Sequence, residues 1–338
     1  MTNELKEIAK AIVAPGKGIL AADESSGTIE KRFKTINVPS TEENRRAYRE
    51  LLFTSAGAND HVSGVILFDE TLRQKAKDGS PFPQLLNKLG VVPGIKVDKG
   101  TKPLAGFPNE VVTEGLDGLR ERFAEYHKLG ARFSKWRAVI SIAAGIPTDY
   151  CISANAHALA RYAALSQEAG IVPVVEPEVL MDGTNTIEEC YDVTTRVLKT
   201  VFNELYGHRV DFYGMLLKPN MVIAGKGCPK QATTQEVAGG TLCCLKNCVP
   251  AAVPGVVFLS GGQSAAQATA NLNAMNAMGG GPWQLSFSYG RALQDAALKT
   301  WKGEAANVVS AQKAYVHRAK LCGAARYGKY TDAMEKAA

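Results

Sequence analysis

The sequence has no long hydrophobic run and no dense block of charges of one sign. No segment of its 338 residues approaches the roughly eighteen consecutive apolar residues of a membrane-spanning helix, so we expect no membrane association. Glu4, Lys6, Glu7 and Lys10 interrupt the N-terminal segment, which therefore lacks the apolar core of a signal peptide. The 39 basic and 33 acidic residues leave a net charge of +6 that is spread along the chain. This distribution favours a small anionic ligand over nucleic acid.

Cysteine and histidine, the usual ligands of bound metals, are few and widely spaced. The seven cysteines include no C-x-x-C pair, and the spacing of Cys243, Cys244 and Cys248 differs from that of a zinc site. The five histidines form no H-x-x-H or H-x-H motif, and His157 lies in an alanine-rich segment typical of a packed helix. We therefore expect reduced thiols, a cytoplasmic protein and no metal ion. Residues 16–21 match G-x-G-x-x-A but precede their predicted strand, so no dinucleotide cofactor is expected.

Short apolar segments alternate with longer segments of helical periodicity along the chain. The composition, 46% hydrophobic and 21% charged, is that of a globular protein with a large core. The predicted strands are 18–22, 64–68, 92–97, 132–137, 171–175, 212–217, 256–259 and 283–287. The predicted helices between them are 41–53, 116–129, 154–169, 187–205, 234–246, 265–278 and 291–301. This alternation predicts an α/β fold, a single (β/α)8 TIM barrel over residues 1–338. Residues 328–338 are small and charged and are expected to form a mobile tail.

Charged residues end or follow most of the predicted strands. In a barrel of this kind, the carboxyl ends of the strands and the loops after them form the active site. A charged side chain at such a position is costly unless it is paired, so several that converge on one barrel end indicate a functional site. The charged residues at these ends are Asp23, Glu24, Lys96, Asp98, Lys99, Lys135, Arg137, Glu176, Glu178 and Lys218.

Lys218 is the best candidate for a nucleophile in this set. It follows the apolar residues 214–217, and Pro219 stiffens the chain after it. Other cations and apolar walls disfavour the ammonium form of a lysine, and the neutral amine attacks a ketone to form a Schiff base. The protonated imine accepts electrons from a neighbouring carbanion, and adjacent carboxylates move protons. The set therefore indicates metal-independent cleavage of a carbon–carbon bond beside a ketone.

Two turns near the end of the chain have the composition of phosphate-binding loops. Residues 260–264 (Ser-Gly-Gly-Gln-Ser) present backbone N–H groups at the predicted start of a helix. Residues 288–291 (Ser-Tyr-Gly-Arg) add an arginine fork, and phosphate sites after the last two strands are common in this fold. Thr28, Lys31 and Arg32 form a second basic group after Asp23. Two separate anion sites indicate a bisphosphate.

Taken in order, these motifs resemble class I fructose-1,6-bisphosphate aldolase, a family that forms a Schiff base. The matching stretches cover nearly the whole chain: GKGILAADES (16–25), TEENRRAYRELL (41–52), GVILFDETL (64–72), GIKVDKG (94–100), FSKWR (133–137), ARYA (160–163), GIVPVVEPEVL (170–180), LLKPNMV (216–222), FLSGGQS (258–264), FSYGRALQ (287–294) and GKY (328–330). The resemblance implies reversible, metal-independent cleavage of fructose 1,6-bisphosphate into dihydroxyacetone phosphate and glyceraldehyde 3-phosphate, in glycolysis and gluconeogenesis. It also implies no cofactor, sugar phosphates as ligands and a homotetramer.

The resemblance further implies a role for each matching residue. Lys218 would form the imine, Glu176 would act as acid and base on the carbinolamine, and Asp23 would accept the hydroxyl proton at the cleaved bond. Lys135 and Glu178 would adjust the charge around these groups, with assistance from Arg137. The ketone-side phosphate would be held by Ser260, Gly261, Gly262, Ser288, Gly290 and Arg291. The other phosphate would be held by Lys96, Thr28, Lys31 and Arg32, with Arg32 able to move between the two sites.

The C-terminus departs from the family pattern. Animal members end in a tyrosine that assists proton exchange at the enamine carbon, whereas this chain ends in Glu-Lys-Ala-Ala. Tyr330, Tyr327, a carboxylate and solvent are the alternatives for that step. The same departure leaves open whether the bisphosphate or a monophosphate is preferred.

Three other functions compete with this prediction. Another imine-forming barrel, such as a transaldolase or a deoxyribose-phosphate aldolase, needs only one phosphate site. A barrel that serves only as a binding protein is expected to lack Lys218, Glu176 or Asp23, and all three are present. A metal-dependent aldolase needs histidine ligands that these motifs do not supply.

Overall fold

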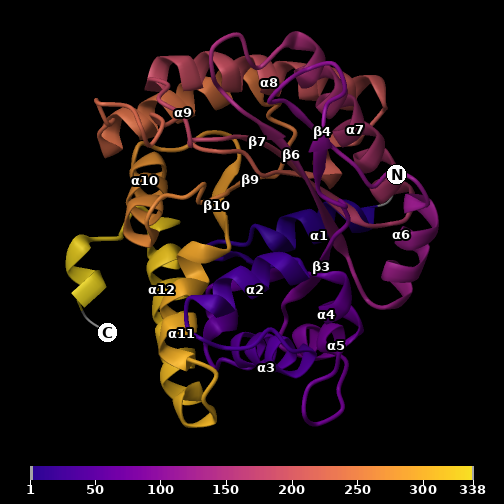
Figure 1. Cartoon of the computed structure of the whole chain (residues 1–338), viewed down its shortest axis with the longest axis vertical. Helices are drawn as coiled ribbons and strands as arrows, with labels where there is room; N and C mark the ends of the chain where they lie inside the picture. Colours follow the sequence, from indigo (N-terminus) through magenta and orange to yellow (C-terminus); the bar gives the residue numbers. More distant parts are fainter. Residues whose placement is uncertain (1–2, 337–338) are drawn as a thin grey trace.

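A computed structural model describes residues 3–336 and contains the predicted closed barrel of parallel strands (Figure 1). The barrel strands are β1 (Gly18–Ala22), β2 (Val62–Leu67), β3 (Val92–Lys96), β6 (Phe133–Ile140), β7 (Val172–Val179), β8 (Leu216–Leu217), β9 (Gly255–Phe258) and β10 (Gln284–Tyr289). Each pairs in parallel with the next along the chain, and β10 pairs with β1 to close the barrel. The (β/α)8 prediction is therefore confirmed.

Helices cover the outside of the barrel (Figure 1). They are α2 (Ser26–Lys34), α3 (Glu42–Phe53), α4 (Asp69–Arg73), α5 (Phe82–Lys88), α6 (Leu119–Lys128), α7 (Asp149–Glu168), α8 (Ile187–Gly207), α9 (Thr234–Cys248), α10 (Ala265–Ala277), α11 (Arg291–Trp301) and α12 (Val308–Ala325). Local capping fixes where two of them begin. Thr186 exchanges side-chain and backbone hydrogen bonds with Glu189 at the start of α8, and Thr233 does so with Glu236 at the start of α9.

Helix α1 (Asn3–Ile12) fills the barrel end opposite the carboxyl ends of the strands. Its apolar face buries Leu5, Ala9 and Ile12 in a cluster with barrel-interior residues that include Ile66 and Phe133. Full burial of one large aliphatic side chain contributes about 1.5–3 kcal/mol. Apolar packing therefore stabilises this end of the barrel, while the charged residues gather at the other.

Three strands extend further at their carboxyl ends than the sequence predicts, and β8 is shorter. β6 continues to Ile140, β7 to Val179 and β10 to Tyr289, so Glu176 and Glu178 lie within a strand rather than after it. The segment predicted as a strand over 212–217 is extended only in β8, and the prediction is wrong for Phe212–Gly214, which form a 3-10 turn. Asp211 starts this turn by accepting a hydrogen bond from the backbone N–H of Tyr213 at 3.0 Å.

Several elements have no counterpart among the predicted segments. They are α2, α4, α5, α12 and an antiparallel pair formed by β4 (Thr101–Pro103) and β5 (Val111–Thr113). Helix α12 packs against α10 and α11 beside the point where the barrel closes, and its Tyr315 is fully buried. The outer layer therefore contains one more helix at this point than the alternation of strands and helices indicates.

The last described residues fold back onto α10 and α12. The backbone N–H of Tyr330 donates to Asn273 Oδ1 at 2.8 Å, and its hydroxyl donates to Glu335 at 2.8 Å. Arg318 of α12 lies 2.6 Å from the same carboxylate. Residues 337 and 338 lie outside the described part of the chain. The mobility of the segment 328–338 and the single-domain boundary stay predictions.

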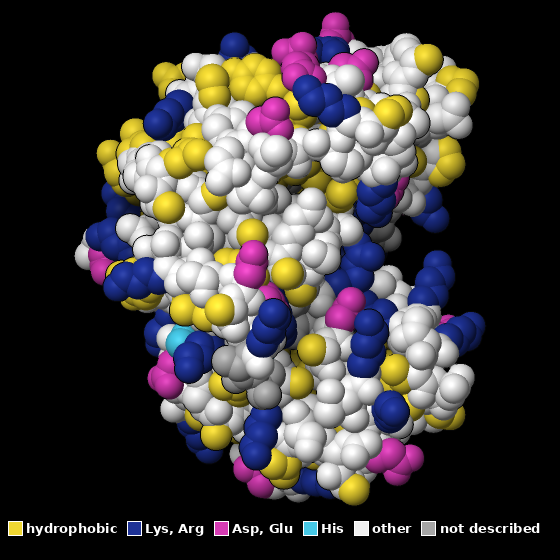
Figure 2. Space-filling model, turned by 90° about the vertical axis from the view of Figure 1, so that its left-hand side faces the viewer, with side chains coloured by type: hydrophobic (Ala, Val, Ile, Leu, Met, Phe, Trp, Pro, Cys, Tyr) yellow, Lys and Arg dark blue, Asp and Glu magenta, His cyan; other side chains and the backbone are white. Residues whose placement is uncertain are grey.

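The surface and the thiols agree with the composition. Figure 2 shows one face of the molecule, on which lysine and arginine side chains are interspersed with acidic and hydrophobic ones. The seven cysteines are free thiols, and most of them are buried. Within residues 3–336, no helix combines the length and the apolar character needed to cross a membrane.

Candidate active site

A cavity of about 350 Å³ opens at the carboxyl ends of the barrel strands. The predicted site residues that line it are Asp23, Thr28, Arg32, Lys96, Lys135, Arg137, Glu176, Glu178, Lys218, Ser260, Gly261, Ser288, Gly290 and Arg291. Two predicted residues do not line it: Lys31 is exposed on α2, and Gly262 follows the lining residue Gly261. The barrel therefore brings together side chains that are far apart in the sequence.

Strand alternation aims four charged side chains into this cavity. Lys135 and Arg137 are two residues apart on β6, and Glu176 and Glu178 are two residues apart on β7, so each pair shares one face of its strand. The register pairs Arg137 with Glu176. Arg137 Nε and Glu178 Oε2 form a close ion pair at the edge of the cavity. Trp136, on the opposite face of β6, is fully buried in the apolar core.

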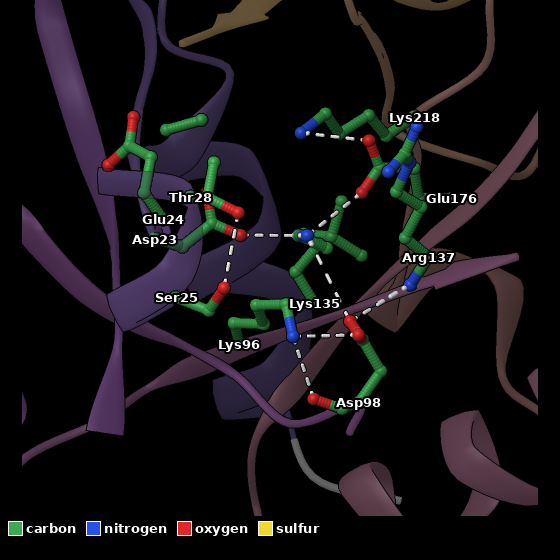
Figure 3. Close-up of polar contacts among 12 residues, drawn as sticks. Asp23, Glu24, Ser25, Thr28, Lys96, Asp98, Lys135, Arg137, Glu176 and Lys218 are labelled. Atoms are coloured by element: carbon green, nitrogen blue, oxygen red, sulfur yellow. Dashed lines mark hydrogen bonds and ion pairs between the residues drawn. The ribbon is translucent and has the colours of Figure 1, made fainter. Parts of the chain in front are cut away.

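Lys218, Glu176, Lys135 and Asp23 form a continuous chain of alternating charges (Figure 3). Lys218 Nζ lies 3.1 Å from Glu176 Oε1, and Glu176 Oε2 lies 3.2 Å from Lys135 Nζ. Lys135 Nζ also lies 2.7 Å from Asp23 Oδ2. The backbone N–H of Lys218 donates to the carbonyl of Val175 at 2.8 Å, which fixes the lysine one residue beyond the end of β8.

Burial and neighbouring charges act in opposite directions on the pKa values of Asp23 and Lys135. The side chains of Lys218 and Lys135 are each 5% exposed, and that of Glu176 is 4% exposed. Burial opposes the charge on Asp23, but the charges of Lys135 and Lys218 outweigh it and hold the pKa of Asp23 well below its ordinary value. Burial also opposes the charge on Lys135, but Asp23 and Glu176 outweigh it and hold the pKa of Lys135 well above its ordinary value. Asp23 is therefore a carboxylate and Lys135 an ammonium at neutral pH.

Asp98, which the sequence places at a strand end without a role, connects two lysines of the cavity. Its Oδ1 lies 2.7 Å from Lys96 Nζ, and its Oδ2 lies 4.0 Å from Lys135 Nζ. Its Oδ2 also accepts the backbone N–H of Arg137 at 3.3 Å. Asp98 therefore orients Lys96 toward the cavity and adds negative charge beside Lys135.

Glu24, the second acidic residue without a predicted role, holds two arginines beside the cavity. Its Oε1 lies 2.6 Å from Arg32 Nη1 and accepts a hydrogen bond from Gln294 Nε2 at 2.8 Å. Its Oε2 lies 2.7 Å from Nη2 of Arg49, a residue of α3 whose side chain is only 2% exposed. The only sequence signal was the position of Glu24 directly after Asp23 at a strand end. The contacts show that Glu24 positions Arg32.

The turns after β9 and β10 have the geometry of an anion site. Gly261 and Gly262 have φ angles of 55° and 84°, which glycine adopts without strain. Helix α11 begins directly after Gly290, and a Cβ at Gly290 would lie 3.6 Å from Arg32 Nη2. The hydroxyl of Ser288 is buried and has no hydrogen-bond partner among the described residues. Backbone N–H groups at a helix start and an unpaired hydroxyl can bind a phosphate.

Comparison with known sequences gives the same family for the whole chain. A family model described as "Fructose-bisphosphate aldolase class-I" matches residues 4–338. The "Probable fructose-bisphosphate aldolase class 1" of Xanthomonas campestris pv. campestris is 59% identical and aligns with 97% of this chain and 98% of its own length. The "Fructose-bisphosphate aldolase" of Dictyostelium discoideum is 55% identical and aligns with 97% of this chain and 93% of its own length.

Comparison with solved structures agrees with this result. Fructose-bisphosphate aldolase from Plasmodium falciparum, crystallised in complex with TRAP and a small molecule inhibitor, superposes with a TM-score of 0.96. The two chains are 51% identical, and the match covers 97% of this chain and 95% of the other. Sequence, fold and cavity agree, and this chain belongs to the class I fructose-bisphosphate aldolase family.

Proposed function

We propose that Lys218 attacks the ketone of fructose 1,6-bisphosphate and that this chain cleaves the sugar reversibly into dihydroxyacetone phosphate and glyceraldehyde 3-phosphate. The observation that carries the proposal is the buried chain of charges from Lys218 through Glu176 and Lys135 to Asp23. It lies in a cavity that is also lined by most of the residues expected to bind two phosphates. The family is one of carbon–carbon lyases that act in glycolysis and gluconeogenesis.

Glu176 is placed to move protons while the imine forms. Its Oε1, 3.1 Å from Lys218 Nζ, accepts the ammonium proton and leaves a neutral amine. The amine attacks the C2 ketone carbon, and one proton of the attacking nitrogen passes to the ketone oxygen to give a neutral carbinolamine. Glu176 then returns a proton to the carbinolamine hydroxyl, which leaves as water while the nitrogen lone pair forms the C=N bond.

Asp23 is the base for carbon–carbon cleavage. Because its pKa is held low, it is a carboxylate at neutral pH and accepts the proton of the C4 hydroxyl. The electrons of the C3–C4 bond move into the iminium and give an enamine, while C4 becomes the aldehyde of glyceraldehyde 3-phosphate. Lys135, 2.7 Å away, holds Asp23 in place. Glu178 and Arg137, paired at the edge of the cavity, balance the charge nearby.

The enamine carbon must then gain a proton before hydrolysis of the imine releases dihydroxyacetone phosphate. Neither Tyr327 nor Tyr330 lines the cavity. Tyr327 packs against Gly16, which precedes β1 at the opposite end of the barrel. The two residues are so close that a Cβ on Gly16 would lie 2.7 Å from the Tyr327 hydroxyl. Tyr330 is held by Glu335. Of the four alternatives, we therefore favour a site carboxylate or water.

The two anion-binding groups favour the bisphosphate over a monophosphate. We assign the ketone-side phosphate to Ser260, Gly261, Gly262, Ser288, Gly290 and Arg291, and the other phosphate to Lys96, Thr28 and Arg32, whereas the expected part of Lys31 has no support because its side chain is exposed on α2 and does not line the cavity. Arg32 pairs with Glu24 at 2.6 Å and also lies beside Gly290. This position between the two groups supports a movement of Arg32 from one phosphate to the other.

We further propose that the chain is a cytoplasmic homotetramer that binds sugar phosphates and neither nucleic acid nor membranes. The family resemblance supports the tetramer, and the dispersed charge supports the absence of a nucleic-acid partner. A relative from Arabidopsis thaliana that is 55% identical is named "Fructose-bisphosphate aldolase 5, cytosolic", which supports the location. Sedimentation equilibrium at four times the chain mass is the expected result, and a monomer would contradict the tetramer.

A cleavage assay tests the proposed function. The chain is given fructose 1,6-bisphosphate or fructose 1-phosphate in excess chelator, and the dihydroxyacetone phosphate formed is measured. We expect turnover in chelator, faster on the bisphosphate. Lys218→Ala should abolish it, whereas Lys313→Ala, which changes an exposed lysine of α12, should not. Unchanged turnover in Lys218→Ala would overturn the proposal.

A further inference from the structure

Three side chains of the kinds that bind metals meet outside the active site, between α7 and α8. His157 comes from α7, Glu204 comes from the last turn of α8, and His208 follows the end of α8. The two helices are neighbours in the outer layer of the barrel (Figure 1). None of the three residues lines the catalytic cavity. The cluster is therefore separate from the chemistry proposed above.

The spacing of these side chains is close to that of a metal site. His157 Nδ1 lies 3.0 Å from Glu204 Oε2, and His208 Nδ1 lies 3.7 Å from the same oxygen. One ligand atom from each residue lies within 4.8 Å of the other two. Zinc bonds of about 2.0–2.2 Å at tetrahedral angles place neighbouring ligand atoms about 3.4 Å apart. His157 and Glu204 are therefore already close to this separation, and a reorientation of the His208 ring completes the set.

A backbone hydrogen bond prepares the His208 ring for binding. Its Nδ1–H donates to the backbone carbonyl of Glu204 at 2.9 Å, which leaves Nε2 with a free lone pair. Fixation of the tautomer by a carbonyl is common behind metal-bound histidines. Glu204 and His208 are four residues apart and so lie on one side of α8. A change in the side-chain torsions of His208 then directs Nε2 toward the other two residues.

We propose that His157, Glu204 and His208 bind one divalent first-row transition-metal ion, for which Zn²⁺ is the best fit. Two imidazole nitrogens and one carboxylate oxygen are a common ligand set for zinc, and water fills the remaining position. In the metal-free chain, His157 Nδ1 and Glu204 Oε2 are within hydrogen-bond distance, and the two imidazole rings are in contact, with centroids 5.0 Å apart. The ion takes the place of this hydrogen bond.

The cluster is open to an ion from solution. The side chain of His157 is 53% exposed, that of Glu204 is 34% exposed, and that of His208 is 26% exposed. The expectation that His157 is a packed helix residue is therefore wrong, because it lies on the outward face of α7. A bound ion joins α7 to α8, which the intervening strand β7 separates along the chain. This link stabilises the outer layer without contact with the substrate.

Calorimetric titration with Zn²⁺ alone, in a buffer without phosphate, tests the site on the full chain. We expect one ion per chain and an upward shift of the unfolding temperature. His157→Ala and His208→Ala should each weaken binding by more than about tenfold. Glu204→Gln, which keeps the shape but removes the anionic ligand, should weaken it similarly. His127→Ala is the matched control, because it removes a half-buried histidine of α6 that is not in the cluster.

Further variants distinguish zinc binding at this cluster from zinc binding at the exposed thiol. They also keep the test of the zinc site independent of the proposed aldolase function. Cys243→Ser removes the exposed cysteine and should leave binding unchanged. Loss of binding in Cys243→Ser with retention in His157→Ala assigns the ion to the thiol and overturns the proposal. No binding to the wild-type chain, or equal binding by His157→Ala, also overturns it. Fructose 1,6-bisphosphate cleavage should be the same in all these variants, so failure here leaves the aldolase assignment untouched.

Discussion

Lys135 Nζ on β6 lies 2.7 Å from Oδ2 of Asp23 at the end of β1, although β3 and β2 separate these two strands in the barrel. The ion pair therefore crosses the mouth of the barrel. Lys135 also lies 3.2 Å from Glu176, so one ammonium holds both the carboxylate that we propose for imine formation and the carboxylate that we propose for cleavage. Since all three are largely buried, loss of any one leaves an uncompensated charge.

Lys135→Met should destabilise the chain and strongly slow cleavage. It leaves Asp23 and Glu176 without their shared cation, and removal of one partner from a buried ion pair costs about 3–5 kcal/mol. Denaturant unfolding measures the loss of stability, and the cleavage assay measures kcat. Lys34→Met, which alters a surface pair whose lysine is 71% exposed, is the control and should change neither. Equal stability of Lys135→Met and wild type would contradict this description of the site.

Acid should reduce stability through Asp23. Burial alone would raise the pKa of Asp23, but Lys135 and Lys218 hold it below its ordinary value of 3.8. A carboxyl whose pKa is lowered on folding stabilises the folded chain fully at a pH above its unfolded pKa. This stabilisation is lost as the pH falls from the unfolded pKa to the folded pKa. The difference in unfolding free energy between wild type and Asp23→Asn should therefore be constant between about pH 5 and pH 7 and shrink below about pH 4. A difference that stays the same at lower pH would refute the ionisation described here.

Glu24→Ala should destabilise the fold without removing any residue of the chain of charges. It leaves the buried guanidinium of Arg49 unpaired, and an uncompensated buried charge of this kind costs about 3–5 kcal/mol. It also frees Arg32, so KM for the bisphosphate should rise. The matched control is Glu30→Ala, which breaks an exposed pair with Lys34 and should leave the unfolding temperature unchanged. Indistinguishable unfolding temperatures for the two variants would show that Glu24 has no structural role.

Neither C-terminal tyrosine should be needed for turnover. Tyr330→Phe removes the hydrogen bond to Glu335 and should lower stability by about 1 kcal/mol, and Tyr327→Phe should be neutral. In both variants kcat and the rate of proton exchange at the enamine carbon, followed with deuterated solvent, should match wild type. A large loss of exchange in either variant would assign the proton to that tyrosine.

The barrel and most of its cavity could be predicted because both depend on local sequence. Branched apolar segments end in charged residues, and a closed parallel barrel brings all those ends to one side. This rule alone places Lys218, Glu176 and Asp23 in one site despite their separation along the chain. The rule does not decide which residues of the basic group after Asp23 reach the cavity: Thr28 and Arg32 of α2 line it, whereas Lys31 of the same helix is exposed.

The features that could not be predicted depend on contacts between distant elements. Glu24 pairs with Arg49 on α3, and no local pattern connects an acidic residue at a strand end with one arginine among several in a helix. His157 and Glu204 are 47 residues apart, so their contact follows only from the packing of α7 on α8. The shortening of β8 came from the side chain of Asp211, whose turn-forming hydrogen bond outweighs the apolar character of the residues after it.

Reductive trapping followed by peptide mapping is the most direct test of the imine on Lys218. The chain is incubated with fructose 1,6-bisphosphate, treated with borohydride, digested and analysed by mass spectrometry. The account predicts one adduct, of the mass of reduced dihydroxyacetone phosphate or the hexose, on the peptide that contains Lys218, and none in Lys218→Ala. An adduct on Lys135 or another lysine, or equal trapping in Lys218→Ala, would contradict it.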